Sequence, residues 1–146
     1  MAEPADCLFD RIVAGLVAAP VVFEDESSLA FLDHRPIFPG HTLLIPKQHY
    51  ETLADLPGTL IQPFFANAQL LAGAIEEALE ADGTFIAINN RVSQSVPHLH
   101  VHIVPRRKKD GLRGFFWPRG TYHGPDEAEK IRKNIADAVT RLRAVG

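Results

Sequence analysis

The sequence has a single cysteine, Cys7, and no apolar run near the roughly 20 residues that a membrane-spanning helix needs. One cysteine cannot form a disulfide within the chain, which favours a reducing, cytoplasmic location. The first five residues contain no basic residue and do not resemble a secretory signal. We therefore expect a cytoplasmic protein without a membrane partner.

Basic charge is not in excess either, because 15 lysines and arginines against 18 aspartates and glutamates give a formal net charge of −3. A protein that binds nucleic acid through bulk charge carries a positive surplus, so no nucleic-acid partner is expected. Hydrophobic residues make up 46% of the chain, enough to form a core and to exclude disorder of the whole chain. Repeats and Ser/Gly-rich linkers are also lacking, so residues 1–146 are predicted to form one domain.

Hydrophobic periodicity predicts both helices and strands. The expected helices cover residues 7–16, 59–81 and 125–145, and the expected strands cover residues 21–23, 29–32, 42–46, 84–88 and 96–104. Pro63 fits the long central helix only within its first turn. Because helices and strands do not alternate regularly, the pattern favours an α+β fold. We expect a mainly antiparallel sheet of about five strands, with an amphipathic C-terminal helix.

Three of the seven histidines, His98, His100 and His102, occupy alternate positions within five residues. Side chains of a strand point alternately to its two faces, so the three imidazoles should share one face and the aliphatic residues between them the other. Such a face is an active-site wall, a metal site or a solvent-exposed surface. One interpretation is a zinc-dependent hydrolase that uses the three histidines as ligands.

The run of residues 89–104, which contains the pattern His-φ-His-φ-His-φ-φ, resembles the signature of the histidine triad family. Residues 7–15 resemble the opening helix of that family. Residues 29–33 and 39–49 resemble its nucleotide-pocket strand and the segment that follows. The resemblance spans residues 7–106 and implies a HIT-like fold and a homodimer.

The resemblance also implies a chemistry, because members of the family hydrolyse or transfer nucleotidyl groups by attack at the α-phosphate of an ester, anhydride or phosphoramidate. His100 would be the nucleophile and form a nucleotidyl-histidine intermediate, as a neutral imidazole can near neutral pH. His102 would donate to a phosphate oxygen or the leaving-group bridge and stabilise charge as the bond breaks, or would only support His100. His98 would have a structural or orienting role. The alternative is a nucleotide-binding regulatory protein with vestigial activity.

Binding residues follow from the same resemblance. Asp33 matches the acid that accepts hydrogen bonds from the ribose hydroxyls. Phe31 is either an apolar wall for the base or part of the core. Gln94 and Ser95 match a pair of residues that contact the phosphate. Asn89 matches an asparagine that lines the same site, and the alternative is that it belongs to an ordinary turn.

A metal is not required for this chemistry. Some relatives carry Cys-x-x-Cys in the opening helix and bind zinc with two histidines, which match His49 and His98. Here Asp10 replaces the second cysteine, so Cys7, Asp10, His49 and His98 would form at most a weak structural zinc site. The basic run of residues 106–109 is interpreted as a solvated loop, and the alternative is that it attracts polyphosphate or an acidic leaving group. Trp117 loosely resembles a tryptophan beyond the triad that closes the leaving-group side in some branches of the family.

Overall fold

The computed structural model describes residues 6–112 and 119–145. They divide between two compact units, and the division falls between Asp110 and Gly111. The first unit contains the sheet, and the second contains one long helix. That residues 1–146 act as a single domain remains a prediction.

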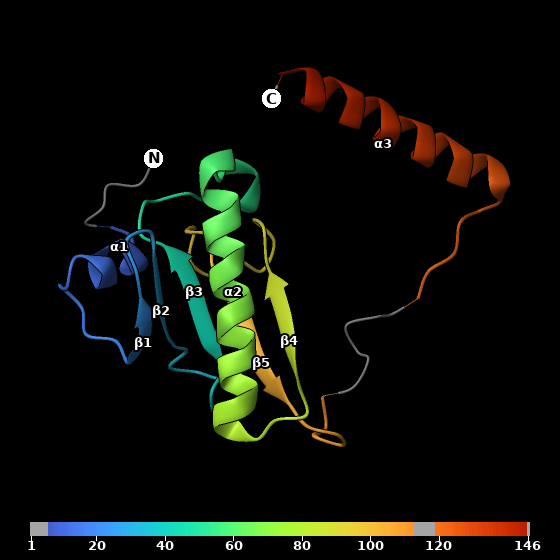
Figure 1. Ribbon diagram of the computed structural model, residues 1–146. Coiled ribbons are helices and arrows are strands. Elements are labelled where there is room, and N and C mark those ends of the chain that lie inside the picture. The colour runs from blue at the N-terminus through green and yellow to red at the C-terminus, as the bar shows by residue number, and fades with distance from the viewer. Residues whose placement is uncertain (1–5, 113–118, 146) are drawn as a thin grey trace. The chain divides into compact units, whose positions relative to one another are not determined.

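The first unit is built on a five-stranded antiparallel sheet (Figure 1). The strands, in spatial order, are β1 (Val21–Glu24), β2 (Ser28–Leu32), β3 (Thr42–Pro46), β5 (Val101–Arg106) and β4 (Gly83–Ile88). Each neighbouring pair is antiparallel. The strands at the two ends of this order, β1 and β4, are the edges of the sheet. The predicted α+β class and the five-stranded antiparallel sheet are confirmed.

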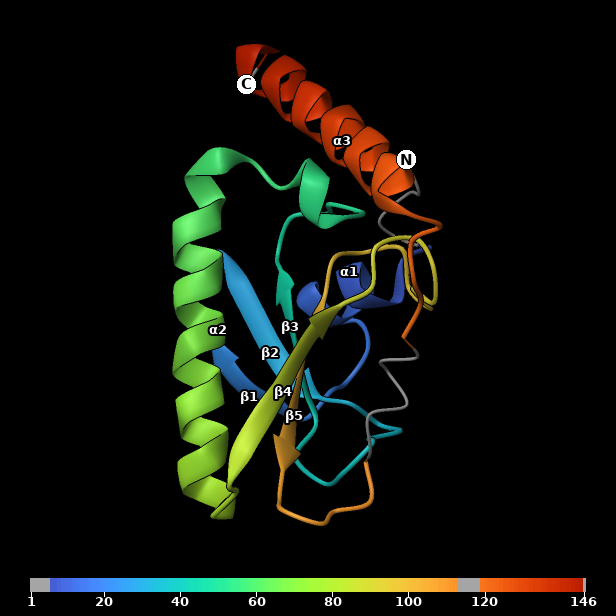
Figure 2. The same ribbon diagram turned by 90° about the vertical axis from the view of Figure 1, so that its right-hand side faces the viewer.

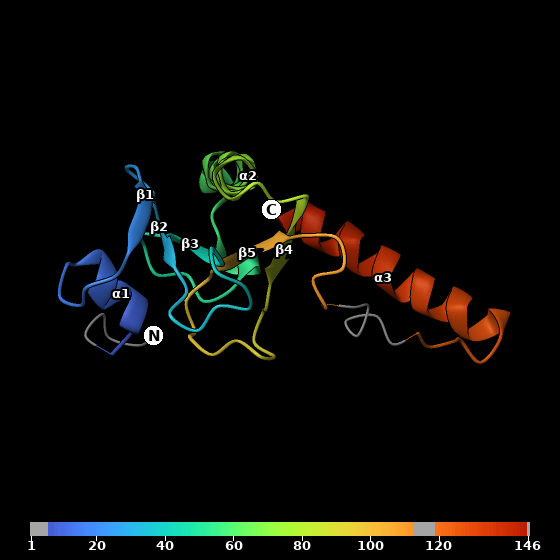
Figure 3. The same cartoon turned by 90° about the horizontal axis from the view of Figure 1, so that it is seen from below.

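The sheet is covered by α2 (Gly58–Leu79) on one face and by α1 (Leu8–Val13) on the other (Figures 2 and 3). A short 3₁₀ helix, η1 (Leu53–Asp55), precedes α2. One core cluster joins the sheet to α2, and its buried members include Ala30, Leu44, Phe64, Ala68, Leu71, Ile75, Leu99, Val101 and Ile103. The second cluster joins the sheet to α1 and contains Cys7, Phe9, Leu29, Phe31, Leu43 and Ile45.

Pro63 lies deeper in α2 than predicted, because the helix begins at Gly58 and the proline falls in its second turn. A proline at this position cannot donate a hydrogen bond to the carbonyl of Thr59. Thr59 is exposed, so water can satisfy that carbonyl, and the helix continues past the proline.

The prediction of a strand over residues 96–104 was wrong at its start, because β5 begins at Val101. The amide of His98 donates to the carbonyl of Val96 at 2.8 Å, which folds the chain into a tight turn before the ladder begins. The amide of Leu99 then donates to the carbonyl of Tyr50 at 2.6 Å, away from either neighbouring strand. Among the three histidines, only His102 therefore lies within the strand.

The second unit contains α3 (Pro125–Val145), the predicted C-terminal helix. None of its residues is buried, and its apolar side chains at Ile131, Ile135 and Leu142 are exposed. Within residues 6–112 and 119–145, neither this helix nor any other combines the length and apolar character needed to cross a membrane.

Candidate active site

Backbone carbonyls determine which ring nitrogens of His98 and His100 carry protons. His98 Nε2 donates to the carbonyl of Pro46 at 2.8 Å, and His100 Nδ1 donates to the carbonyl of His98 at 2.7 Å. Burial lowers the pKa of both rings below the usual value, which favours the neutral forms. A neutral ring has one proton, so Nε2 of His100 carries a lone pair, as a nucleophile requires.

His102 lies next to His100, with ring centroids 4.9 Å apart. Burial lowers the pKa of His102 to about 4, and the charges of His100 and His41 add to the effect. Nδ1 of His102 is 3.0 Å from Nε2 of His41, a buried side chain that the sequence patterns did not single out. The two histidines are 61 residues apart, and only the register of β3 against β5 shows that they meet.

A cavity of about 290 Å³ opens beside these rings. Its walls are mostly apolar, and its polar groups are supplied by Asp33, His34, Ser95, His100 and His102. The apolar walls come from Leu8, Phe9, Ile12, Val17, Ala18, Ala19, Pro20, Phe31, Leu32, Leu43 and Val96. Five predicted site residues, at positions 31, 33, 95, 100 and 102, therefore line the same cavity.

Asn89 and Gln94 are not among the residues that line this cavity. The amide nitrogen of Gln94 donates to the carbonyl of Glu51 at 2.6 Å, and its oxygen accepts from the amide of Arg91 at 2.8 Å. Both ends of the Gln94 side chain thus hold the loop that precedes the histidines. Asn89 is exposed at the end of β4.

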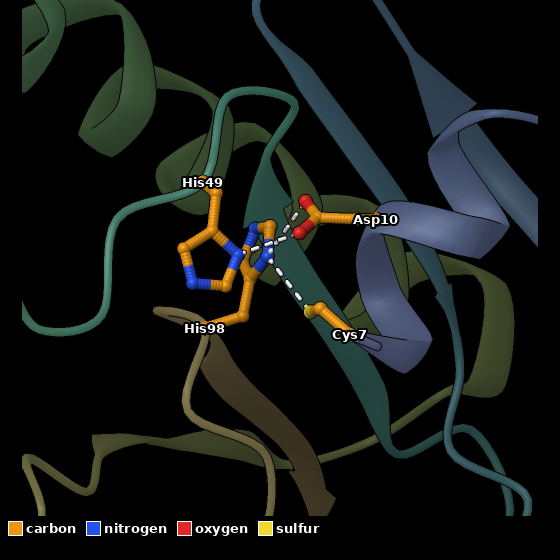
Figure 4. Close-up of side chains that lie close together, drawn as sticks. All are labelled: Cys7, Asp10, His49 and His98. Atoms are coloured by element: carbon orange, nitrogen blue, oxygen red, sulfur yellow. Dashed lines mark hydrogen bonds and ion pairs between the residues drawn. The ribbon is translucent and has the colours of Figure 1, made fainter. Parts of the chain in front are cut away.

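Cys7, Asp10, His49 and His98 converge beside α1 (Figure 4). Their ligand atoms all lie within 4.8 Å of one another. His49 Nδ1 is 2.7 Å from one carboxylate oxygen of Asp10, and His98 Nδ1 is 3.3 Å from the other. His98 Nδ1 carries a lone pair, because Nε2 of that ring is the donor, so two acceptors face each other. A cation between them would relieve this conflict, and the nitrogen, oxygen and sulfur donors suit zinc.

The basic run after β5 is engaged in local contacts. Arg106 Nε lies 2.6 Å from Asp110, and Arg107 donates to the carbonyl of Leu79 at the end of α2. The backbone amide of Lys108 donates to Asp82 at 2.9 Å. These contacts fasten the loop to the end of α2. Trp117 lies outside the described residues.

Comparison with known proteins matches residues 16–109 to the HIT domain. The protein named Protein hit of Bacillus subtilis is 36% identical over 134 residues, which cover 90% of this chain and 92% of that protein. The adenylylsulfatase HINT3 of Arabidopsis thaliana is 35% identical over 109 residues, covering 73% of this chain and 55% of that protein. A zinc-bound histidine triad family protein of Mycobacterium smegmatis has a similar structure, with a TM-score of 0.71 and 37% identity, covering 99% of this chain and 100% of that one.

Proposed function

The chain belongs to the HIT family, which includes hydrolases such as the adenylylsulfatase, and from this premise we propose that it is a nucleotidyl hydrolase or transferase. Its substrate is a nucleotide phosphoramidate, an ester or a dinucleoside polyphosphate. The reaction passes through a nucleotidyl group bound covalently to His100. The observation that carries this proposal is the hydrogen bond from Nδ1 of His100 to the carbonyl of His98, since it leaves Nε2 unprotonated in a ring that lines the cavity.

In the first step, Nε2 of His100 attacks the α-phosphorus, and the bond to the leaving group breaks. The Nε2–H of His102 donates a hydrogen bond to the leaving group, which departs with the electron pair of the broken bond and takes any proton it needs from solvent. The nucleotidyl-imidazole cation that forms keeps its proton on Nδ1 and its hydrogen bond to the carbonyl of His98. This hydrogen bond stabilises the positive charge. In the second step, water attacks the phosphorus and the phosphorus–nitrogen bond breaks. The attacking water loses one proton to solvent, and His100 takes the electron pair of the phosphorus–nitrogen bond and returns to its neutral form.

The nucleoside half of the substrate occupies the cavity. Phe9 and Phe31 form one apolar wall in edge-to-face contact, with centroids 5.4 Å apart, against which a base can pack. Asp33 lines the same cavity, and one of its carboxylate oxygens accepts from the amide of Arg35 at 2.9 Å. That hydrogen bond fixes the carboxylate, which can then accept hydrogen bonds from the ribose hydroxyls.

Asp33→Asn should lower kcat/KM for ribonucleotide substrates by about tenfold, because hydrogen bonds to a charged acceptor are stronger than those to an amide. The kcat/KM for the matching 2′-deoxynucleotide substrate should change by less than about threefold, since that sugar has only one of the two hydroxyls. Asparagine keeps an oxygen for the amide of Arg35, so the loop should stay in place. Equal losses with both sugars would refute the ribose contact.

We also propose that Cys7, Asp10, His49 and His98 bind a zinc ion that stabilises the fold. It would tie α1 to His49, which follows β3, and to His98, which precedes β5. Zinc here would supply cross-linking of these segments, and the catalytic residues His100 and His102 would act without it.

Zinc added to EDTA-treated protein should therefore raise the thermal midpoint, and Asp10→Asn should reduce this increase because it removes an anionic ligand. AMP release should change by less than about twofold on EDTA treatment. Loss of AMP release with EDTA and its return with zinc would instead support a zinc-dependent hydrolase. Differential scanning fluorimetry and a parallel AMP assay provide both readouts.

We further propose a homodimer. Strand β4 is an edge of the sheet, and Ile86 on this strand is 47% exposed. The outer side of α2 also exposes apolar side chains at Ile61, Phe65 and Leu70. Such surfaces are common where two chains associate. Light scattering should give about twice the chain mass of 16.1 kDa, and the chain mass itself would refute the dimer.

A further inference from the structure

We propose that His41 is a positioning residue that holds the proton of His102 on Nε2, and so makes His102 a hydrogen-bond donor toward the substrate. The catalytic meaning of this arrangement rests on the proposed function. The proton position itself is a property of the free protein and can be measured without a substrate.

The argument starts at the backbone amide of Ile37. This amide donates to Nδ1 of His41 at 3.1 Å, and a backbone N–H can only donate. Nδ1 of His41 is therefore an acceptor, and a neutral His41 carries its proton on Nε2. Burial favours that neutral form, because it lowers the pKa of His41.

The same logic extends to His102. Nε2 of His41 is 3.0 Å from Nδ1 of His102, so His41 donates and His102 accepts. The single proton of a neutral His102 must then be on Nε2. A chain of two hydrogen bonds, from the amide of Ile37 to His41 and from His41 to His102, therefore determines which nitrogen of His102 carries the proton.

His41 is held firmly enough for this role. Its side chain is 3% exposed, its amide donates to the carbonyl of Phe38 at 3.0 Å, and its carbonyl accepts from the amide of Asp33 at 2.9 Å. A carboxylate oxygen of Asp33 lies 3.7 Å from Nε2 of His41, which favours a proton on that nitrogen. The ring thus has a fixed position and a fixed direction of donation.

The consequence is that two adjacent histidines carry their protons on opposite nitrogens. His100 has its proton on Nδ1 and offers a lone pair, whereas His102 has its proton on Nε2 and offers a donor. Attack at phosphorus needs the first, and departure of the leaving group needs the second. Without the donor at His41, the two nitrogens of His102 would compete for the proton.

Nitrogen NMR of isotopically labelled histidine in the free protein tests this directly. Near neutral pH, the wild type should show His102 protonated on Nε2. His41→Leu should give a mixture of the two tautomers. His41→Gln should keep the wild-type pattern, because its amide nitrogen can replace Nε2 of the imidazole as the donor. The matched control His123→Gln, at an exposed histidine of the second unit, should change nothing.

Kinetics supply the second readout. His41→Leu should lower kcat by about tenfold, the effect of one ordinary hydrogen bond on the proton position, with KM within about twofold. His41→Gln should recover most of this loss.

His102 protonated on Nδ1 in the wild type would overturn the proposal, even if His41→Leu did not fold. An unchanged His102 tautomer in folded His41→Leu would overturn it as well. A shifted tautomer in a protein that releases no AMP would refute the proposed function and leave the role of His41 intact.

Discussion

Replacing His100 with alanine should lower AMP release by at least about 10³-fold, because the variant lacks the atom that bonds to phosphorus. Adenosine phosphoramidate and a diadenosine polyphosphate serve as substrates, and AMP is quantified by chromatography. The affinity for AMP should stay within about threefold, since the apolar walls and Asp33 form most of the cavity. Loss of turnover with retained binding distinguishes a missing nucleophile from a damaged pocket.

Two further variants sharpen the test. His100→Gly leaves a space of about the size of an imidazole ring, so added imidazole should restore part of the activity. His123→Gln controls for the loss of a histidine as such and should match the wild type. If His100→Ala kept about a tenth or more of the wild-type rate, His100 would not be the nucleophile. If the wild type bound AMP and released none from either substrate, a regulatory nucleotide-binding protein would be the better description.

Gly40→Ala should reduce the free energy of unfolding by about 2–4 kcal/mol. Gly40 has a φ of +101°, a backbone conformation that L side chains rarely adopt. An added Cβ would lie within 2.2 Å of Cδ1 of Leu79 and 3.4 Å of Cγ of Pro105. The segment that positions His41 therefore passes against α2 and β5 at a point where an added Cβ would strain the backbone and force the Leu79 side chain to move.

Gly111→Ala is the matched control for this prediction. Its φ of +89° imposes a similar backbone cost, but no heavy atom of the described residues lies within 4 Å of the added Cβ. It should therefore cost about 1–2 kcal/mol, the contribution of the backbone alone. Urea denaturation followed by circular dichroism measures both variants. Equal losses would show that the contact with Leu79 contributes nothing.

Much of the fold could be predicted from the sequence because apolar patterns report which side of an element is buried. The strand over residues 42–46 was predicted with its observed bounds, since Gly40 precedes it and Pro46 ends it. The strand around the histidines was predicted to start too early, because its prediction also relied on the alternation of side chains. Residues 98–100 continue the alternation of facing side chains, but their amides do not join the ladder. The periodicity of apolar residues indicates which side chains are buried, but it does not indicate which backbone amides pair with a neighbouring strand.

The site could be predicted only in part. The triad and its resemblance to a family drew attention to His100 and Asp33, which line one cavity in the structure. His41 was missed because its contact with His102 depends on the register of two strands. The two hydrogen bonds of the Gln94 side chain to the loop could not be predicted either. They depend on how residues 91–94 fold back toward Glu51.

The central claim, a covalent bond between His100 and the nucleotidyl phosphorus, is tested most directly by stereochemistry. The substrate is an adenosine phosphorothioate derivative of known configuration at the α-phosphorus, hydrolysed in isotopically labelled water. Two successive displacements, first by His100 and then by water, should give retention of configuration, however short-lived the intermediate is. Inversion would show that water attacks the substrate in a single step, and it would contradict the role assigned to His100.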